Sequence, residues 1–212
     1  VRPLELWVGT NSGLRQLERT DGDWRNIASV ALNKSIRTIE ETQDGDVWAA
    51  SPSDGIFRLS IESLSMPARR IPIYRDPQQG VEHREISVSR LGHRIVAATS
   101  LGLYEYSEKE KSFVPDSSFG EEFTNANHSI FRLAEDHHHN VWIHSENENY
   151  FARKLEGGEY QIESAPFSRI PDAQINVFYP EVNGVTWFGG TEGVIRYDAN
   201  VKVNTEVDFP AL

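Results

Sequence analysis

Apolar residues in this chain come in short runs separated by polar turns. Runs such as "LWVG", "VWAA" and "IFRL" are rich in β-branched and aromatic residues, which is typical of buried strands. The pairs Asp21–Gly22 and Gly157–Gly158 lie between such runs and favour tight hairpins. No stretch has the periodicity of a convincing amphipathic helix. The pattern therefore predicts an all-β chain of short antiparallel strands.

The pattern repeats along the chain. Four tryptophans stand in equivalent apolar runs, and a valine takes the same place in a fifth run. The five anchors are Trp7, Trp48, Val96, Trp142 and Trp187. In four copies a glycine follows six or seven residues after the anchor, at Gly13, Gly55, Gly102 and Gly193. The fourth copy has Glu148 and Asn149 at that place.

Each full copy contains four apolar runs. One run precedes the anchor, as in "SIRTIEE", and one follows the glycine; a fourth comes after a polar turn, as in "YQIE". A repeated four-stranded antiparallel unit of about 45 residues is the signature of a β-propeller blade. We therefore predict a β-propeller of four-stranded antiparallel blades with about five repeats. All five tryptophans, including Trp24 on a fourth run, are expected to be buried between blades.

The two ends of the repeat are incomplete. Nothing upstream of Trp7 corresponds to "SIRTIEE", and residues 199–212 suffice only for a fourth strand and a tail. Unpaired inner strands would leave backbone groups exposed. We expect residues 1–212 to form a propeller segment, an incomplete ring or a fragment of a larger propeller. Residues 199–212 are expected to lead into a following domain.

Composition narrows the class of function. The 212 residues are 38% hydrophobic and 25% charged, as in soluble globular proteins. The net charge of −11 argues against a nucleic-acid partner, because phosphate binding needs a concentrated basic surface. Cysteine is absent, which removes disulfides, thiolate zinc sites and cysteine nucleophiles. No apolar run approaches the roughly 18 residues of a membrane span, so no direct membrane insertion is expected.

The composite repeat reads L-x-x-x-I-R-x-I-x-E-D-x-x-G-x-V-W-x-x-T-x-x-G-L-x-R-Y and resembles the two-component regulator propeller repeat. The best matches are "LNKSIRTIEETQDGDVWAASPSDGIFRL" and "NGVTWFGGTEGVIRYD". Val96 and the missing glycine of the fourth copy depart from the pattern. The resemblance implies a non-catalytic periplasmic sensor of a bacterial receptor, which passes ligand or partner binding to a membrane-linked output. That output is a histidine kinase or a nucleotide cyclase in such receptors. The resemblance also implies the remaining receptor domains as partners, a homodimer in the full receptor and no cofactor.

Two alternatives stay open. A propeller can also be a carbohydrate-active enzyme, a glycosidase or a lyase, or a scaffold that only dimerises receptors. The Asp-box of sialidase-like propellers is not met, because Asp44 stands four rather than five residues before Trp48. Acidic pairs such as Glu121 and Glu122 are expected by chance among 32 acidic residues, and most of these lie in predicted turns.

The repeat also predicts where a ligand binds. In propellers one face is built from the loops before each first strand and those between the second and third strands. A small polar ligand, such as a saccharide, is expected on this face. Its candidate residues are Asn11, Lys34, Arg84, Asn127, His128, Asn147 and Glu192.

The segment "AEDHHHNVWIHS" holds four of the seven histidines. On the repeat, His137–His139 form the hairpin tip between first and second strands, on the opposite face. His139 stands where other copies have Gly45 and Gly184, so a positive φ is expected there. Zinc needs three or four converging ligands, whereas side chains on a tight tip diverge. No metal site is expected; His137 and His139 are the weak candidates.

Overall fold

The computed structural model describes residues 4–60, 69–71, 84–124, 128–146, 148–163, 167, 175–191 and 193–201. These residues form strands, turns and loops, with a 3-10 turn at Glu121–Thr124 and no α-helix. No helix in this part of the chain is long and apolar enough to cross a bilayer. The strands pair into five antiparallel sheets, which confirms the predicted all-β propeller class.

The sheets follow one another in chain order. The first contains β1 (Glu5–Thr10), β2 (Gly13–Thr20) and β3 (Asp23–Ala31). The second contains β4 (Thr38–Glu41), β5 (Val47–Ser51), β6 (Gly55–Leu59) and β7 (Arg69–Ile71). The third contains β8 (Ser87–Leu91), β9 (Arg94–Thr99), β10 (Gly102–Ser107) and β11 (Ser112–Pro115). The fourth contains β12 (Ile130–Glu135), β13 (Val141–Ser145), β14 (Asn149–Lys154) and β15 (Tyr160–Glu163). The fifth contains β16 (Ile175–Pro180), β17 (Val185–Gly190) and β18 (Gly193–Asp198).

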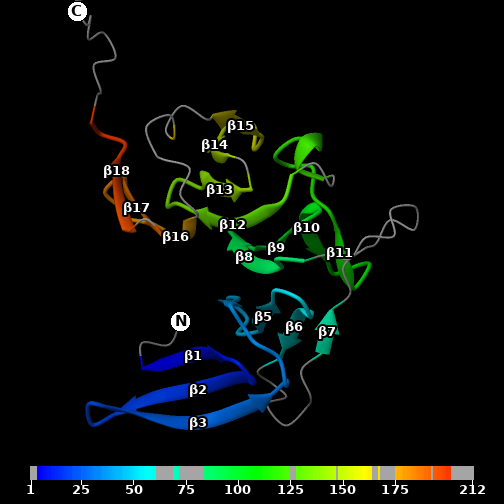
Figure 1. The fold of residues 1–212 in the computed structure, drawn as a ribbon, viewed down its shortest axis with the longest axis vertical. Helices are drawn as coiled ribbons and strands as arrows, with labels where there is room; N and C mark the ends of the chain where they lie inside the picture. The colour runs from blue at the N-terminus through cyan, green and yellow to red at the C-terminus, as the bar shows by residue number, and fades with distance from the viewer. Residues whose placement is uncertain are drawn as a thin grey trace, which may run out of the picture.

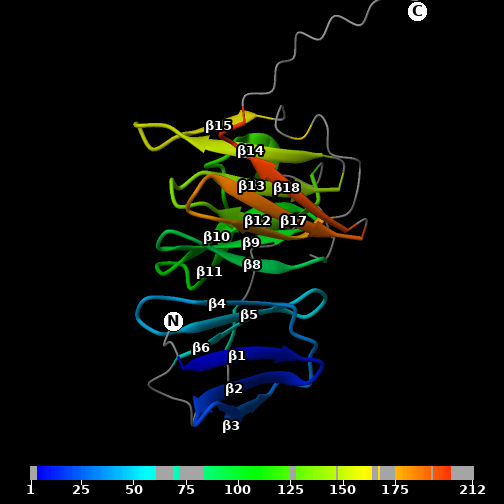
Figure 2. The ribbon, with the colours of Figure 1, turned by 90° about the vertical axis from the view of Figure 1, so that its left-hand side faces the viewer.

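The five sheets lie around an arc, as in the blades of a propeller. Figure 1 shows them in chain order from the blue first sheet, at the bottom, to the orange fifth sheet, at the upper left. Figure 2 shows the first two sheets stacked below the other three. The strands β4, β8, β12 and β16 begin their sheets and contact one another in that order. They are therefore the inner strands, and the anchors of the repeat stand on β1, β5, β9, β13 and β17.

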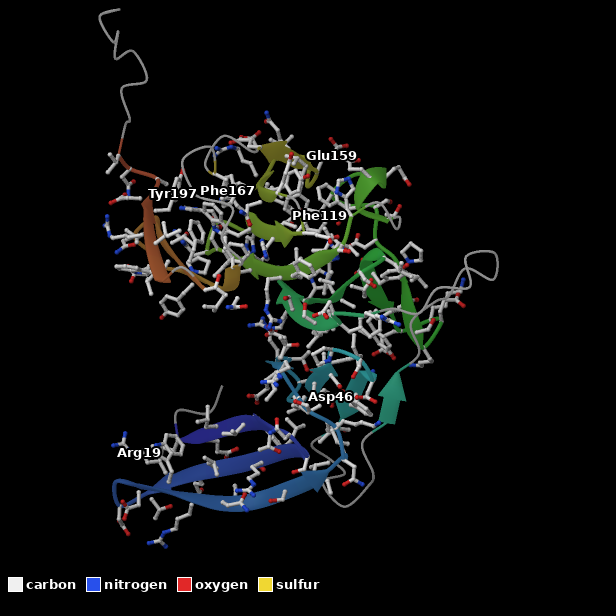
Figure 3. The ribbon with its side chains drawn as sticks, viewed as in Figure 1. Arg19, Asp46, Phe119, Glu159, Phe167 and Tyr197 are labelled. Atoms are coloured by element: carbon white, nitrogen blue, oxygen red, sulfur yellow. The ribbon has the colours of Figure 1, made fainter. Side chains whose placement is uncertain are left out.

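A separate hydrophobic core fills each interface between successive sheets. Trp48 of the second sheet is 2% exposed and packs edge-on against Tyr106 and Phe113 of the third. Trp142 of the fourth sheet makes the same kind of contact with Tyr197 of the fifth. Figure 3 labels Tyr197 near Phe167, which also packs edge-on against Trp142. Trp48 and Trp142 thus join neighbouring blades, as the repeat predicted, whereas Trp187 lies half-buried on a face that no described sheet covers.

An arginine closes the second interface at its edge. The Arg58 guanidinium lies 5.1 Å from the Trp48 ring centroid and 5.5 Å from that of Tyr106. It pairs with Asp46 of its own sheet at 2.5 Å and with Glu108 of the third sheet at 2.7 Å. The cation therefore covers the aromatic contact and joins the two sheets.

The inner strands are also joined by hydrogen bonds. The Val88 amide donates to Thr38 Oγ1 at 2.9 Å, between the second and third sheets. Ser87 Oγ and Ser89 Oγ donate to the carbonyls of Phe131 and Leu133, between the third and fourth. These bonds hold the inner strands of the second, third and fourth sheets against one another.

The prediction for Trp24 is wrong, because its side chain is 46% exposed. It lies on the face of the first sheet that points away from the second sheet. Leu6 and Ile27, on the same sheet, are 47% and 50% exposed. Leu6 pairs with Leu17, and the equivalent pair in the second sheet, Val47 and Leu59, packs against the first sheet. Among the described residues no sheet precedes the first, so its own pair has nothing to pack against.

The fifth sheet has the matching exposed face. Tyr179 and Arg196 are the cross-strand partners of Trp187, so all three lie on one side. This is the side that Trp48 and Trp142 use to contact a following sheet. Tyr179 is 64% exposed and Val194 is 72% exposed. Trp187 is half-buried, and its Nε1 donates to Glu181 at 2.9 Å.

The incomplete copies of the repeat correspond to sheets with fewer strands. The first sheet begins with the strand of Trp7, and within the described residues the first and fifth sheets have three strands each. Most of the expected tail, residues 202–212, lies outside the described residues.

In four sheets a glycine opens the strand that follows the anchor strand. Gly13, Gly55, Gly102 and Gly193 all have positive φ, between 103° and 141°. The fourth sheet lacks this glycine, and hydrogen bonds from Ser145 close its turn. Ser145 Oγ donates to the Glu148 carbonyl at 2.7 Å, and the Ser145 amide donates to the same carbonyl at 2.9 Å.

Candidate functional site

A cavity of about 220 Å³ opens where the inner strands begin. Its residues come from four successive sheets or the loops that lead into them. They are Arg37, Pro52, Glu85, Ile86, Ser87, Phe131, Arg132, Ile175 and Asn176. Ligand sites in β architectures form where several elements converge in this way. We call this cavity the inner-strand pocket.

Arg132 is the most buried of the charged groups in the pocket. Its side chain is half-buried, and its Nε donates to the Asn176 carbonyl at 3.0 Å. Burial lowers the pKa of Arg132, and the nearby Glu85 carboxylate partly offsets this. The guanidinium stays charged at neutral pH, because its ordinary pKa lies so far above that range. The pocket therefore holds a cation that has lost part of its hydration.

Glu85 is the acidic residue of the pocket lining. It is exposed and has a positive φ of 51°, which is uncommon for a residue with a side chain. The neighbouring Arg84 holds this loop in place through its backbone. Its amide donates to Ser100 Oγ at 3.0 Å, and its carbonyl accepts from the Ser100 amide at 2.8 Å.

A second carboxyl lies on the inner strand β4. Burial raises the pKa of Glu40 to about 7, although the charge of Arg90 on β8 acts in the opposite direction. Glu40 comes three residues after Arg37, so it stands further along the strand than the pocket lining. It is a titrating group of the inner strands near neutral pH.

None of the described loop residues that the sequence predicted is among the residues that line the pocket. Lys34 Nζ pairs with Asp54 at 2.5 Å, and Asn11 Oδ1 accepts from Ser35 Oγ at 3.3 Å. The His128 ring lies 5.8 Å from that of Phe123. Arg84 is adjacent in sequence to Glu85. Their role in ligand binding stays a prediction.

Three further candidates, Asn127, Asn147 and Glu192, lie outside the described residues.

The histidine segment forms the predicted hairpin tip. His137–His139 connect β12 to β13, at the end of β12 away from the pocket. His139 has the expected positive φ, 64°, and its Nδ1 lies 2.8 Å from Glu135 Oε1. Asp136 Oδ1 accepts from the His138 and Asn140 amides, which orders the turn. Among the described residues, no group of three His, Cys, Asp or Glu side chains is placed to hold a metal ion.

His144 lies behind the pocket wall. It is 6% exposed, its ring centroid is 5.4 Å from that of Phe131, and its Nδ1 bonds Asn149 Oδ1 at 2.7 Å. Its Nε2 has no hydrogen-bond partner among the described residues. Burial lowers the pKa of His144, and the charge of Arg132 lowers it further. His144 therefore responds to the electrostatics of the pocket without lining it.

Sequence reasoning missed the lining residues, although the repeat contains a signal for them. Arg37, Ser87, Phe131 and Asn176 each follow the isoleucine that opens the first run of a copy. The four residues occupy one column of the repeat, and that column varies from Arg to Ser, Phe and Asn. This column, at the start of each inner strand, is the signal that could have located the lining.

Comparisons with known proteins add the following. No family model and no curated protein sequence matches the chain. Among solved structures, the chain is similar to the extracellular domain of the hybrid two component system BT4673 from B. thetaiotaomicron. That match has a TM-score of 0.68, 17% identity, and covers 95% of this chain and 27% of the other. The corresponding domain of BT3049 has a TM-score of 0.61 and 17% identity, over 92% of this chain and 25% of the other.

A streptogramin B lyase is also similar, with a TM-score of 0.57 and 14% identity, over 93% of this chain and 66% of the enzyme. Identities at this level show the fold alone. The chain spans about a quarter of the length of the extracellular domains that it matches.

Proposed function

We propose that this chain is a ligand-binding sensor segment of an extracytoplasmic receptor of the two-component type. The observation that carries the proposal is the inner-strand pocket, which residues from four successive sheets line together. A ligand in that position contacts several blades at once. It can therefore favour one relative arrangement of the blades over another, which is the requirement for a signal.

The similar extracellular domains of two-component systems support this role. Their position outside the cytoplasm supports a periplasmic location for this chain. In this proposal the segment itself is non-catalytic and passes the signal to a membrane-linked output elsewhere in the receptor. A homodimer of the full receptor belongs to the same proposal.

The remaining parts of such a receptor have a place to pack. The outward faces of the first and fifth sheets expose the positions that are buried at the internal interfaces. Because the same packing recurs between every pair of described neighbours, further sheets of the same receptor are the occupants that we propose for both faces.

The rival function is an enzyme of the propeller fold, as the similarity to a streptogramin B lyase illustrates. Glycoside hydrolysis requires two converging carboxyl groups. Among the described residues, Glu85 is the acidic residue that lines the pocket. The geometry therefore favours binding over hydrolysis at this site.

A ligand screen tests the proposal. Thermal shifts are measured for the wild-type chain with neutral sugars, sugar acids and amino acids, and each mixture is analysed for products by mass spectrometry. The variant Asn176→Trp fills the pocket from an exposed position. Its matched control is Val177→Trp, at the next residue of β16, which is exposed but absent from the pocket lining.

The proposal predicts a ligand that stabilises the wild type and Val177→Trp, leaves Asn176→Trp unchanged, and is recovered intact. At 100 times its Kd such a ligand stabilises the fold by about 2.7 kcal/mol. A screen without any stabilising compound contradicts the proposal, as does a shift that persists in Asn176→Trp. Turnover that is lost in Asn176→Trp supports the enzyme.

A further inference from the structure

The charges of the inner-strand pocket indicate what kind of molecule it takes. Two guanidinium groups line it, Arg37 and Arg132, and one carboxylate, Glu85. Elsewhere the partly buried arginines are paired: Arg58 with Asp46, and Arg94 with Glu105 at 2.8 Å. Among the described residues, neither Arg37 nor Arg132 has a carboxylate oxygen within 4.0 Å.

The unpaired state of Arg132 is the more informative of the two. Arg132 is half-buried, and of its guanidinium nitrogens only Nε has a hydrogen bond within the described residues, to the Asn176 carbonyl. A guanidinium that has lost water without gaining an anion costs free energy. Its planar fork of donors matches a carboxylate. A bound anion would offset the desolvation cost of Arg132, which no carboxylate among the described residues offsets within 4.0 Å.

The balance of charges limits the anion. The two arginines and Glu85 leave a formal charge of +1 among the lining residues. This sum favours a ligand of charge −1, because the Glu85 carboxylate opposes a second negative charge in the same small space. A carboxylate satisfies this balance, whereas a phosphate ester close to −2 does not.

The rest of the lining suits a hydroxylated molecule. The Asn176 side-chain amide has no hydrogen bond to another described residue, so it can both donate to and accept from hydroxyl groups. The Phe131 ring and the side chains of Ile86 and Ile175 offer apolar surface for C–H groups. The volume of about 220 Å³ lies below the range of drug-sized sites, so it fits a small molecule.

We propose that the inner-strand pocket binds a small hydroxylated monocarboxylate, with its carboxylate at Arg132 and Arg37 and a hydroxyl at Asn176. This inference rests on the proposed sensor function and adds the chemical class of the ligand.

Matched pairs of compounds test the class. Calorimetric titrations compare glucuronate with glucose, galacturonate with galactose, and gluconate with sorbitol, so each pair differs in one carboxylate. Glucose 6-phosphate tests the second negative charge. The inference predicts that in at least one pair the carboxylate binds about tenfold or more tightly than its neutral partner, because charge-assisted hydrogen bonds are the strong ones. Glucose 6-phosphate is expected to bind more weakly than glucuronate.

Three variants test the residues. Arg132→Gln should weaken the carboxylate about tenfold or more and leave the neutral partner unchanged. Glu85→Gln should increase the affinity for the carboxylate and reduce the difference between its affinity and that of glucose 6-phosphate. A folding defect cannot increase affinity. Arg25→Gln, an exposed change on β3, is the control and should alter nothing.

Equal affinity within every pair overturns the inference, and so does a complete absence of binding in this panel. Binding of a neutral sugar that is abolished by Asn176→Trp also overturns the assignment of a carboxylate ligand. It leaves the sensor proposal standing. The sensor proposal fails separately, when no compound of the broader screen depends on Asn176.

Discussion

At the scale of single residues, the pocket arginine has an effect that can be measured without any ligand. The charge of Arg132 acts with burial to hold the pKa of His144 below its ordinary value of 6.5. We predict that Arg132→Gln raises the pKa of His144, because it removes the repulsion of a second cation. A pH titration of the His144 ring signals by NMR measures the change, with Arg25→Gln as the control. An unchanged pKa would show that Arg132 lies further from His144 than the structure places it.

Glu40 is expected to make stability depend on pH. In the unfolded chain this carboxyl loses its proton near its ordinary pKa of 4.5, but burial in the fold raises the pKa to about 7. Between those values the folded state binds more protons than the unfolded state, so the free energy of unfolding falls as pH rises from 4.5 to about 7 and stays level, as far as Glu40 is concerned, at higher pH.

The variant Glu40→Gln stays neutral throughout this range. We predict that its free energy of unfolding, relative to that of the wild type, rises by about 1–2 kcal/mol from pH 5 to pH 8, after allowance for solvent screening. Urea unfolding at both pH values measures the difference. Parallel pH profiles for the two proteins would refute the burial of this carboxyl.

At the scale of elements, the interface between sheets is the unit of stability. Trp48 and Trp24 are the matched pair, because one is 2% exposed at an interface and the other is 46% exposed on an outward face. We predict that Trp48→Ala costs about 3–5 kcal/mol. Trp24→Ala should cost about 1 kcal/mol or less. Similar losses in chemical denaturation of both variants would contradict the assignment of their faces.

The glycine after the anchor strand also shapes the hairpin that it opens. Gly13 has a φ of 141°, and a Cβ there would collide with the Val30 carbonyl on β3. We predict that Gly13→Ala destabilises the fold by about 1–3 kcal/mol, through the strained backbone and the displaced strand. Gly157→Ala is the control, since its φ is ordinary and a Cβ there meets nothing within 4 Å. Equal stability of the two variants, measured by urea unfolding, would count against this turn geometry.

The strands, the hairpins and the order of the blades were predictable because the same pattern of strands and turns occurs in five copies. A single tryptophan run is ambiguous, but five equivalent runs fix which strand is second and where the turns fall. Exposure was not predictable to the same extent. Trp24 has the composition of a core residue, yet its burial depends on a neighbouring sheet that no local pattern encodes.

The residues that line the pocket were not predicted from the sequence. Loop polarity pointed to Lys34, Arg84 and His128, and the lining residues stand one to four positions further along the chain, at Arg37, Glu85 and Arg132. Polar residues occur in every surface loop, so polarity alone could not separate the two sets. What selects the lining is the curvature of the arc, which brings the starts of four inner strands together.

At the scale of the whole molecule, the outward faces of the first and fifth sheets should dominate the behaviour of the chain in solution. Tyr179 and Val194 are 64% and 72% exposed on the fifth sheet. We predict that the double variant Tyr179→Gln and Val194→Gln keeps the stability of the wild type within about 0.5 kcal/mol. It should also bind less of a hydrophobic dye and self-associate less in analytical ultracentrifugation. A loss of stability with unchanged dye binding would mean that this face is covered within the chain.

The most direct test of the account is a crystal structure of the chain with the tightest-binding compound from the ligand screen. The account predicts that the compound occupies the inner-strand pocket intact and contacts Arg132 and Asn176 from different sheets. A compound found on the hairpin tips or outward faces, with the pocket empty, would contradict it.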